Sequence, residues 1–511
     1  MLKIPGTAPK RVGFDNEKYL AEQTAAIHER VAEFGTKLYL ELGGKLVYDY
    51  HASRVLPGFH PNVKMELLRK MKDDADIILC IHAGDIERRK IRADFGITYD
   101  ADALKLIDDL KEQGLLVKAV VITRFDNQPA AAAFKNKLEH RGVRVYTHRF
   151  TRGYPTEVDI VVSEEGYGAN EYIDTGKPLV VVTGPGPGSG KLATCLSQMY
   201  HDHRRGAKSG YAKFETFPIW NLPLKHPVNV AYEAATADIR DFNVVDPFHL
   251  EATGTVAINY NRDVEIFPVL RRILTRITGS PRYQSPTDMG VNRAGFGIVD
   301  DAAVQDAAGQ EVIRRYFRYR CEHVMGFVDR ETVQKVELLM DDLGLKPENR
   351  AVVGPARQAA DEAQAKGKGN EGFFCGAAME LPDSSIVTGK NSASMHAAAS
   401  LILNAAKQLA GIPDQLHLLS PVVIEAIADL DRHVLRKKTV SLDVAETLIA
   451  LSVSATTNPT AHLALERLKD LQGCEVHSTH IPTPGDEEGL RKLGVNLTSD
   501  PNFSSHSLFA G

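Results

Sequence analysis

A glycine-rich loop in the first half of the chain holds the residues best suited to chemistry. The segment 178–194, PLVVVTGPGPGSGKLAT, places an apolar run before a loop that ends in Gly-Lys and opens into a helical pattern. Small residues let several backbone N–H groups approach one anion, while a lysine and a helix N-terminus add positive charge. We therefore predict a phosphate-binding loop, whose candidate residues are Gly184, Gly186, Gly188, Ser189, Gly190, Lys191 and Thr194.

The loop differs from the phosphate loop of NTPases, which reads Gly, four residues, Gly-Lys and then Ser or Thr. Counting back from Gly190 reaches Pro185, and Leu192 stands where the Mg²⁺-binding hydroxyl belongs. ATP and Mg²⁺ stay candidate cofactors if Thr194 or Ser189 supplies that hydroxyl. The alternative is a glycine-rich turn between a strand and a helix that binds no ligand.

The carboxylate that NTPases place at the end of a strand to hold the metal ion has no clear counterpart. Asp238 is the candidate for this role, but it does not directly follow an uninterrupted apolar segment, and Asp241 and Asp246 follow soon after it. Asp85, after the run IILCIHAG, is a rival. We therefore expect a phosphate-bearing small molecule as the ligand, assign no metal site, and treat phosphoryl transfer as a further hypothesis.

A basic stretch, HDHRRGAKSGYAK, follows at residues 201–213. Its cations could neutralise a transferring phosphoryl group. Cations near the C-terminus of a helix are also stabilised by the helix dipole. We therefore interpret Arg204 and Arg205 as part of a solvated helix end.

Short apolar runs alternate with amphipathic helical patterns through the first half of the chain. The runs are KLYLEL, DIILCIH, VKAVVITR, VRVYTH, VDIVVS and LVVVTG, and ADALKLIDDLKEQG is typical of the helices between them. This alternation predicts a parallel sheet covered on both faces. We expect residues 1–250 to form a doubly wound α/β domain of P-loop or Rossmann-like type, with the glycine loop at the carboxyl end of a strand.

The pattern changes twice after residue 250. Long amphipathic helices predict a mainly helical connecting domain at 251–346, which could also be a dimerisation surface. A second α/β domain is expected at 347–511. Its strands are FFCGAAMEL, SSIVTG, CEVHSTHIP and GVNLTSD, and a helical insertion lies near 421–468.

The segment 376–409 resembles the core of cytidine-deaminase-like domains, in which two strands precede a helix that carries His-Ala-Glu. The chain has His396, Ala397 and Ala398 at this place, and 420–424 reads SPVVI where a deaminase needs Pro-Cys-x-x-Cys. The glutamate and both thiolates of the zinc site are missing. The resemblance therefore implies the architecture without its zinc chemistry, although residues 390–392 could line a pocket beside His396.

Composition limits the classes of partner. The chain has 511 residues and a net charge of -5, which gives no global attraction to nucleic acid or to an anionic membrane. Its five cysteines are scattered and odd in number, which favours a reducing cytoplasm. The N-terminal segment lacks the apolar core of a signal peptide, and no run reaches the roughly 18 apolar residues of a membrane span.

Four segments together resemble the bacterial family known as domain of unknown function 1846, also called uncharacterised protein family 0371. They are GPGPGSGKLATCLSQMYHDHRRG, NVAYEAATADIRDFNVVDPFH, NRDVEIFPVL and VTGKNSASMHAAASLILNA. The resemblance covers essentially the whole chain and implies a multidomain, cytoplasmic, bacterial protein. It implies no reaction, substrate or catalytic residue.

Whether the protein is an enzyme stays open at this stage. The leading hypothesis is a protein that binds ATP or a phosphometabolite at the loop, as in a small-molecule phosphotransferase. One alternative is a metal-independent enzyme that anchors a phosphorylated substrate there. Another is a non-catalytic, homo-oligomeric ligand-sensing or scaffolding protein. Calorimetry with phosphate-bearing ligands separates these hypotheses.

Overall fold

The computed structural model describes residues 11–92, 96–437 and 440–505. It contains two compact units, residues 11–308 and a unit that begins at residue 309. The division falls within helix α13 (Asp301–Val324). It differs from the three parts expected from the sequence, because residues 251–308 belong to the first unit and contribute a strand to its sheet.

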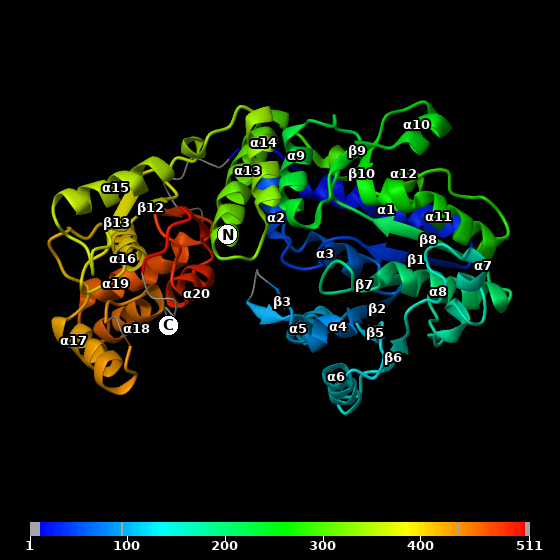
Figure 1. Ribbon diagram of the computed structural model, residues 1–511, viewed down its shortest axis with the longest axis horizontal. Coiled ribbons are helices and arrows are strands. Elements are labelled where there is room, and N and C mark those ends of the chain that lie inside the picture. Colours follow the sequence, from blue (N-terminus) through cyan, green and yellow to red (C-terminus); the bar gives the residue numbers. More distant parts are fainter. Residues whose placement is uncertain (1–10, 93–95, 438–439, 506–511) are drawn as a thin grey trace. The chain divides into compact units, whose positions relative to one another are not determined.

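The first unit is built on a seven-stranded, wholly parallel sheet (Figure 1). The strand order is β11-β8-β1-β7-β2-β5-β6. The central strands β2 and β7 are almost entirely buried, which is why their sequences read as continuous apolar runs. The strands are β1 (Lys37–Leu42), β2 (Ala75–His82), β5 (Val117–Thr123), β6 (Val145–His148), β7 (Leu179–Thr183), β8 (Ser209–Phe214) and β11 (Gly290–Val291).

Helices cover both faces of this sheet. Helix α8 packs on β1, β7 and β8 and contacts α11, whereas α1 packs on β1, β8 and β11 and contacts α3. The helices are α1 (Asn16–Phe34), α2 (Tyr50–Val55), α3 (Val63–Lys70), α4 (Ala83–Glu87), α5 (Tyr99–Glu112), α6 (Pro129–Glu139), α7 (Val158–Val161), α8 (Lys191–Arg204), α9 (Pro227–Ala235), α10 (Pro247–Thr253), α11 (Asn261–Thr278) and α12 (Pro286–Met289). Two antiparallel pairs, β3 (Ile91–Arg92) with β4 (Ile97–Thr98) and β9 (Asn243–Val245) with β10 (Ile258–Tyr260), lie outside the sheet.

One expected strand is a helix. The run VDIVVS was predicted as β structure, but Val158–Val161 form the single-turn helix α7. Val158 and Val161 are buried, whereas Asp159 is exposed. Apolar residues three positions apart share a helix face, and an apolar run this short is compatible with either a helix or a strand. The strand prediction for this segment was therefore wrong.

The second unit is a smaller α/β arrangement. Its four-stranded sheet has the order β13-β12-β14-β15, in which β12 runs antiparallel to both neighbours and β14 pairs parallel with β15. The strands are β12 (Gly376–Glu380), β13 (Ile386–Lys390), β14 (Glu475–Ser478) and β15 (Asn496–Ser499). The helices are α14 (Arg330–Asp342), α15 (Val353–Ala365), α16 (Ala397–Ala410), α17 (Pro421–Asp429), α18 (Val444–Ser454), α19 (Pro459–Arg467) and α20 (Pro484–Lys492).

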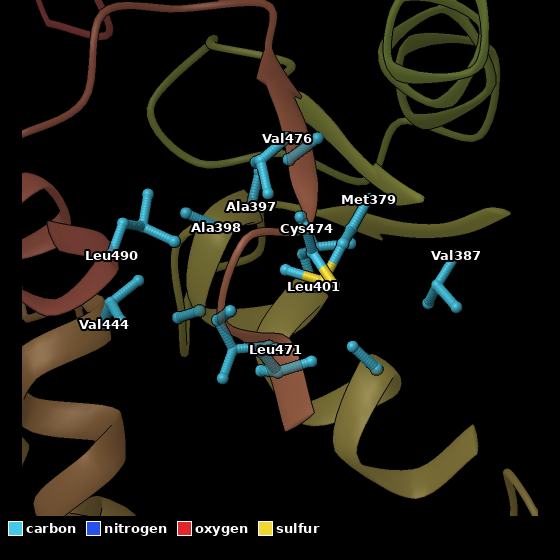
Figure 2. Packing of buried hydrophobic residues seen from close by; sticks show 14 of the residues in the cluster. Met379, Val387, Ala397, Ala398, Leu401, Val444, Leu471, Cys474, Val476 and Leu490 are labelled. Carbon is cyan, nitrogen blue, oxygen red and sulfur yellow. The ribbon is translucent and has the colours of Figure 1, made fainter. Parts of the chain in front are cut away.

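The core of this unit lies between the sheet and α16. Figure 2 shows Met379 and Val476 of the sheet beside Ala397, Ala398 and Leu401 of this helix. The small residues of α16 let its backbone approach the strands closely, so the alanine-rich sequence forms a buried helix. Strands are present in the four expected segments with a helix between them, and helices α17–α19 lie within residues 421–468.

Candidate functional site

The glycine-rich loop, residues 184–190, lies at a switch point of the parallel sheet. It joins β7 to α8, and the chain then crosses β1 to reach β8. The neighbouring strand β2 leads in the opposite direction, through α4 and α5, to β5. Right-handed crossovers would place α8 and α5 on opposite faces, the arrangement in which open α/β sheets bind ligands at the carboxyl ends of their strands, here β7 and β2.

The loop is fixed by contacts with neighbouring strand ends. The hydroxyl of Thr123, the last residue of β5, donates to the carbonyl of Ser189 at 2.8 Å. A Cβ on Gly190 would lie 2.6 Å from Thr123, and Gly190 has a φ of +88°. A Cβ on Gly184 would lie 2.5 Å from the Cys80 carbonyl. These glycines are therefore required by packing within the protein.

Five backbone N–H groups of the loop and the helix start lack protein acceptors among the residues that the structure describes. Within the described part of the chain, no protein acceptor receives the N–H groups of Gly186, Gly188, Ser189, Gly190 or Lys191. The Lys191 ammonium folds back over the loop, where it donates to the Gly186 carbonyl and the Ser189 hydroxyl at 3.4 Å each. Donors and positive charge are thus gathered at the helix N-terminus.

The two candidate hydroxyls point into the protein. Ser189 is 1% exposed, and Thr194 is fully buried below the loop. The Cys80 thiol lies 3.4 Å from the Thr194 hydroxyl, and burial raises the pKa of this thiol to about 12, so it stays protonated and can donate. Thr194 is therefore a core contact in this structure, whereas Lys191 is half-buried at the start of α8.

The aspartates considered as metal ligands make contacts with other protein groups. Asp85 pairs with Arg88. Asp246 accepts the N–H of Phe248 and His249 at the start of α10. Among the described residues, no group of three or more histidine, cysteine, aspartate or glutamate side chains is arranged to hold a metal ion.

Asp238 and Asp241 belong to the segment that follows α9. Asp241 is buried and pairs with Arg262 at 2.6 Å. Asp238 is exposed in the 3₁₀ turn Ala237–Ile239. Neither closes a strand of the sheet, so the metal-holding position of an NTPase is not reproduced by these residues.

A charged cluster lies at the same edge of the sheet, and the sequence analysis singled out only its lysine, Lys213, as one of the cations of the basic stretch 201–213. Lys213 of β8 contacts Glu215 at 2.6 Å and also pairs with Asp263 of α11. Glu41 of β1 is in register with Lys213 and accepts the Tyr211 hydroxyl at 2.8 Å. Two carboxylates thus pair with one ammonium group, and the third, Glu41, acts on it through its charge.

This sharing perturbs the titration of the cluster. Burial raises the pKa of Glu215 to about 7, because the Lys213 ammonium offsets only part of the burial and the carboxylates of Asp263 and Glu41 oppose ionisation. Burial lowers the pKa of Lys213, but the three carboxylates outweigh it and the net shift is upward. The only sequence signals were the charged residues inside the apolar runs KLYLEL and GYAKFE.

The described residues contain no helix long and apolar enough to cross a membrane.

Comparison with known proteins covers nearly the whole chain. Residues 12–344 match the family model described as domain of unknown function DUF1846, N-terminal, and residues 348–509 match its C-terminal counterpart. A UPF0371 protein of Clostridium botulinum (strain 657 / Type Ba4) is 56% identical over 501 residues, which is 98% of this chain and 99% of the relative. A UPF0371 protein of Clostridium tetani (strain Massachusetts / E88) is 54% identical over 500 residues, with the same coverage of both chains. The chain therefore belongs to the UPF0371 family, whose two parts are the N- and C-terminal DUF1846 domains.

Proposed function

We propose that the protein binds the phosphate group of a small molecule at the loop 184–191. The observation that carries this proposal is the set of loop N–H groups without protein acceptors beside the Lys191 ammonium. An anion at this position would accept several of these N–H groups and would be favoured by the dipole of α8. The switch point between β7 and β2 is also where open α/β sheets bind their ligands.

The fixed shape of the loop supports binding. The contacts of Gly184, Gly190 and Thr123 hold the backbone in place, so little conformational entropy would be lost when an anion binds. Gly188 differs from these glycines, because a Cβ there would meet no atom within 4 Å. The open side of the loop at Gly188 is the side from which a phosphate would approach.

The body of the ligand would extend across β1 toward the Lys213 cluster. Glu41 is in register with Val182 of β7 and with Lys213 of β8, so Lys213 lies two strand spacings, about 10 Å, from the strand that carries the loop. A phosphate anchored at one end and a group that can exchange a proton near neutral pH, Glu215, at the other suit an enzyme of a phosphorylated metabolite. ATP with Mg²⁺ would need a metal-holding carboxylate in addition.

Isothermal titration calorimetry with inorganic phosphate, ADP and ATP, each with and without Mg²⁺, tests the proposal. We expect binding of at least one probe, weakened about 10- to 100-fold by Lys191→Ala, as for a lost hydrogen bond to a charged group. Lys177→Ala is the matched control, because Lys177 precedes the amino end of the same strand and donates to the Lys72 carbonyl. Equal affinity of wild type and Lys191→Ala, or no binding at millimolar probe, would refute the proposal. A requirement for Mg²⁺ would favour phosphoryl transfer over simple anchoring.

For the second unit we infer a deaminase-like framework that has lost zinc chemistry. The β12–β13 hairpin followed by α16, with His396 at the N-cap, supports this inference. Ala398 occupies the place of the glutamate that a zinc deaminase uses to move protons. A zinc content measurement on purified protein tests it, and stoichiometric zinc that Asp486→Asn or His396→Gln removes would contradict it.

A further inference from the structure

The second unit contains a cavity of about 350 Å³ that the proposed phosphate site does not involve. Its walls come from strands β12 and β14, from the segments around 370–375 and 480–483, and from the first turns of α16, α18 and α20. A volume of this size lies within the range of small-molecule sites. Apolar lining is supplied by Phe373, Ala377, Val476, Ile481, Leu490 and Leu497.

A histidine–carboxylate pair lies at the helix end of this cavity. His396 Nδ1 is 2.7 Å from Asp486 Oδ2. Asp486 is 4% exposed and also accepts the Thr483 hydroxyl and the Val444 N–H, at 3.0 Å each. Because three groups fix this carboxylate, the imidazole ring is held with its Nδ1 proton directed at Asp486.

The remaining edge of the His396 ring is open to the cavity. Among the residues that the structure describes, none makes a hydrogen bond with His396 Nε2, although His396 is a lining residue with a side chain 23% exposed. A purely structural histidine at a helix N-cap would satisfy both of its nitrogens or leave one to bulk water. Here the histidine lines a cavity that also has apolar lining residues.

Backbone donors of the same helix start belong to residues that line the cavity. The first-turn N–H groups of Ala397 and Ala398 have no acceptor within the described ranges, and both residues line the cavity. The other two helix starts are capped internally, since Asp443 accepts the Glu446 N–H and Thr483 accepts the Asp486 N–H. The N-terminus of α16 therefore offers donors to a ligand, and so does the Gly485 N–H of α20, which also has no acceptor among the described residues.

The charge of the cavity limits the class of ligand. Glu446 pairs with Lys437, and Asp486 pairs with His396. The lining nevertheless holds more acidic than basic groups: Glu371, Asp443, Glu446 and Asp486 against Lys437, with His396 and His480 as the histidines. A carboxylate or phosphate would be repelled by this lining, whereas a neutral or cationic molecule would be accepted.

We propose that this cavity is a second small-molecule site, in which His396 acts as a general base toward an uncharged or cationic compound that has an apolar body and an O–H or N–H group. The proton of that group transfers to Nε2 and leaves its electron pair on the oxygen or nitrogen of the compound. The imidazolium that forms keeps its Nδ1–H donated to Asp486, and the N–H groups of Ala397 and Ala398 face the charge that develops. Asp486 is the positioning residue of the pair.

The electrostatic surroundings agree with this role. Burial lowers the pKa of His396, but the hydrogen bond and charge of Asp486 raise it, and Asp443 and Glu446 raise it further, so the net shift is upward. The basic groups among the other lining residues are Lys437 and His480. Burial lowers the pKa of His480, so His480 adds no positive charge at neutral pH.

NMR of full-length protein labelled with ¹³C at histidine Cε1 tests the proposal. The probes are benzyl alcohol, benzylamine and benzoate, which share one ring and differ in charge. We expect benzyl alcohol and benzylamine to shift the His396 resonance, which His396→Gln identifies, and benzoate to bind at least about tenfold more weakly. His462→Gln, an exposed position on α19, is the matched control.

Two further measurements keep the test independent of how well His396→Gln folds. Benzyl alcohol should protect His396 of the wild type from diethyl pyrocarbonate, as mapped by mass spectrometry. Asp486→Asn should lower the pH at which the His396 resonance titrates, a change that loss of packing alone would not produce. Tighter binding of benzoate than of benzyl alcohol, absence of binding by all three probes at millimolar concentration, or unprotected His396 would overturn the proposal.

Discussion

Replacement of Glu215 by glutamine should remove a pH-dependent loss of stability from the first unit. Glu215 is 3% exposed, and its pKa is raised from 4.5 to about 7 by burial among the carboxylates that share Lys213. Between about pH 4.5 and 7 the folded protein therefore holds a proton that the unfolded chain has released. Stability contributed by this proton is complete below the unfolded pKa and is lost as the pH rises through the folded pKa.

The magnitude follows from the shift. A change of one pKa unit corresponds to about 1.4 kcal/mol, so the shift of Glu215 is worth about 3 kcal/mol of unfolding free energy. Glutamine cannot release a proton, and Glu215→Gln should lack this decline. We expect the stability of Glu215→Gln relative to wild type to increase by about 2.5 kcal/mol between pH 5 and pH 8, because part of the change occurs below pH 5.

Urea unfolding at several pH values measures this difference. Trp220 is the only tryptophan of the chain and belongs to the first unit, so its fluorescence reports the unfolding of that unit. Glu112→Gln is the control, because Glu112 is exposed on α5 of the same unit. A difference between Glu215→Gln and wild type that stays constant within about 1 kcal/mol, or that falls with pH, would refute the reasoning about the shared ammonium.

Three further predictions concern packing. Gly190→Ala should destabilise the first unit by about 3 kcal/mol and Gly188→Ala by about 1 kcal/mol, because both glycines have a positive φ but only at Gly190 would the added Cβ meet neighbouring atoms. Unfolding followed by fluorescence measures both losses of stability, and equal losses would contradict the reasoning from these contacts. Arg350 is 1% exposed and ion-paired, so Arg350→Met should destabilise the second unit by about 3–5 kcal/mol. Hydrogen exchange in peptides from 348–505 should become faster, and unchanged exchange would argue against a structural role for Arg350. All five cysteines are buried, and burial raises the pKa of Cys80 and Cys375 to about 12 each. No thiol should therefore react with Ellman's reagent faster than the protein unfolds. Rapid release of one equivalent of chromophore would disprove this prediction.

The parallel sheet could be predicted from the sequence because its central strands are buried on both faces. Such strands need continuous apolar runs, and these runs alternate with amphipathic helices in DIILCIH, VKAVVITR and LVVVTG. The place of the glycine loop, after β7 and before α8, followed from the same pattern. The extent of the first unit did not, because β11 has only two residues and gives no apolar run of its own.

The charged cluster and the histidine pair could not be predicted, because each depends on residues far apart in the chain. Asp263 is 50 positions from Lys213, and Asp486 is 90 positions from His396. Helical and strand periods describe only local spacing, and strand order decides which distant side chains meet. The local signal that was present is the capping box of Asp443 and Glu446, which marks one of the helix starts around the cavity.

The glycines of the loop therefore carry less functional information than their number suggests. Gly184 and Gly190 are required by the Cys80 carbonyl and by Thr123, whether or not a ligand binds. Evidence for a ligand must come from polar groups whose position, or whose lack of a protein partner, is not explained by packing within the protein. The unpartnered N–H groups and the folded-back Lys191 are such groups, because polar donors are normally satisfied by protein or solvent. If phosphate occupies this loop, Gly188 is the glycine whose substitution should weaken binding with a smaller loss of stability than at Gly184 or Gly190, since a Cβ at Gly188 would meet no protein atom within 4 Å.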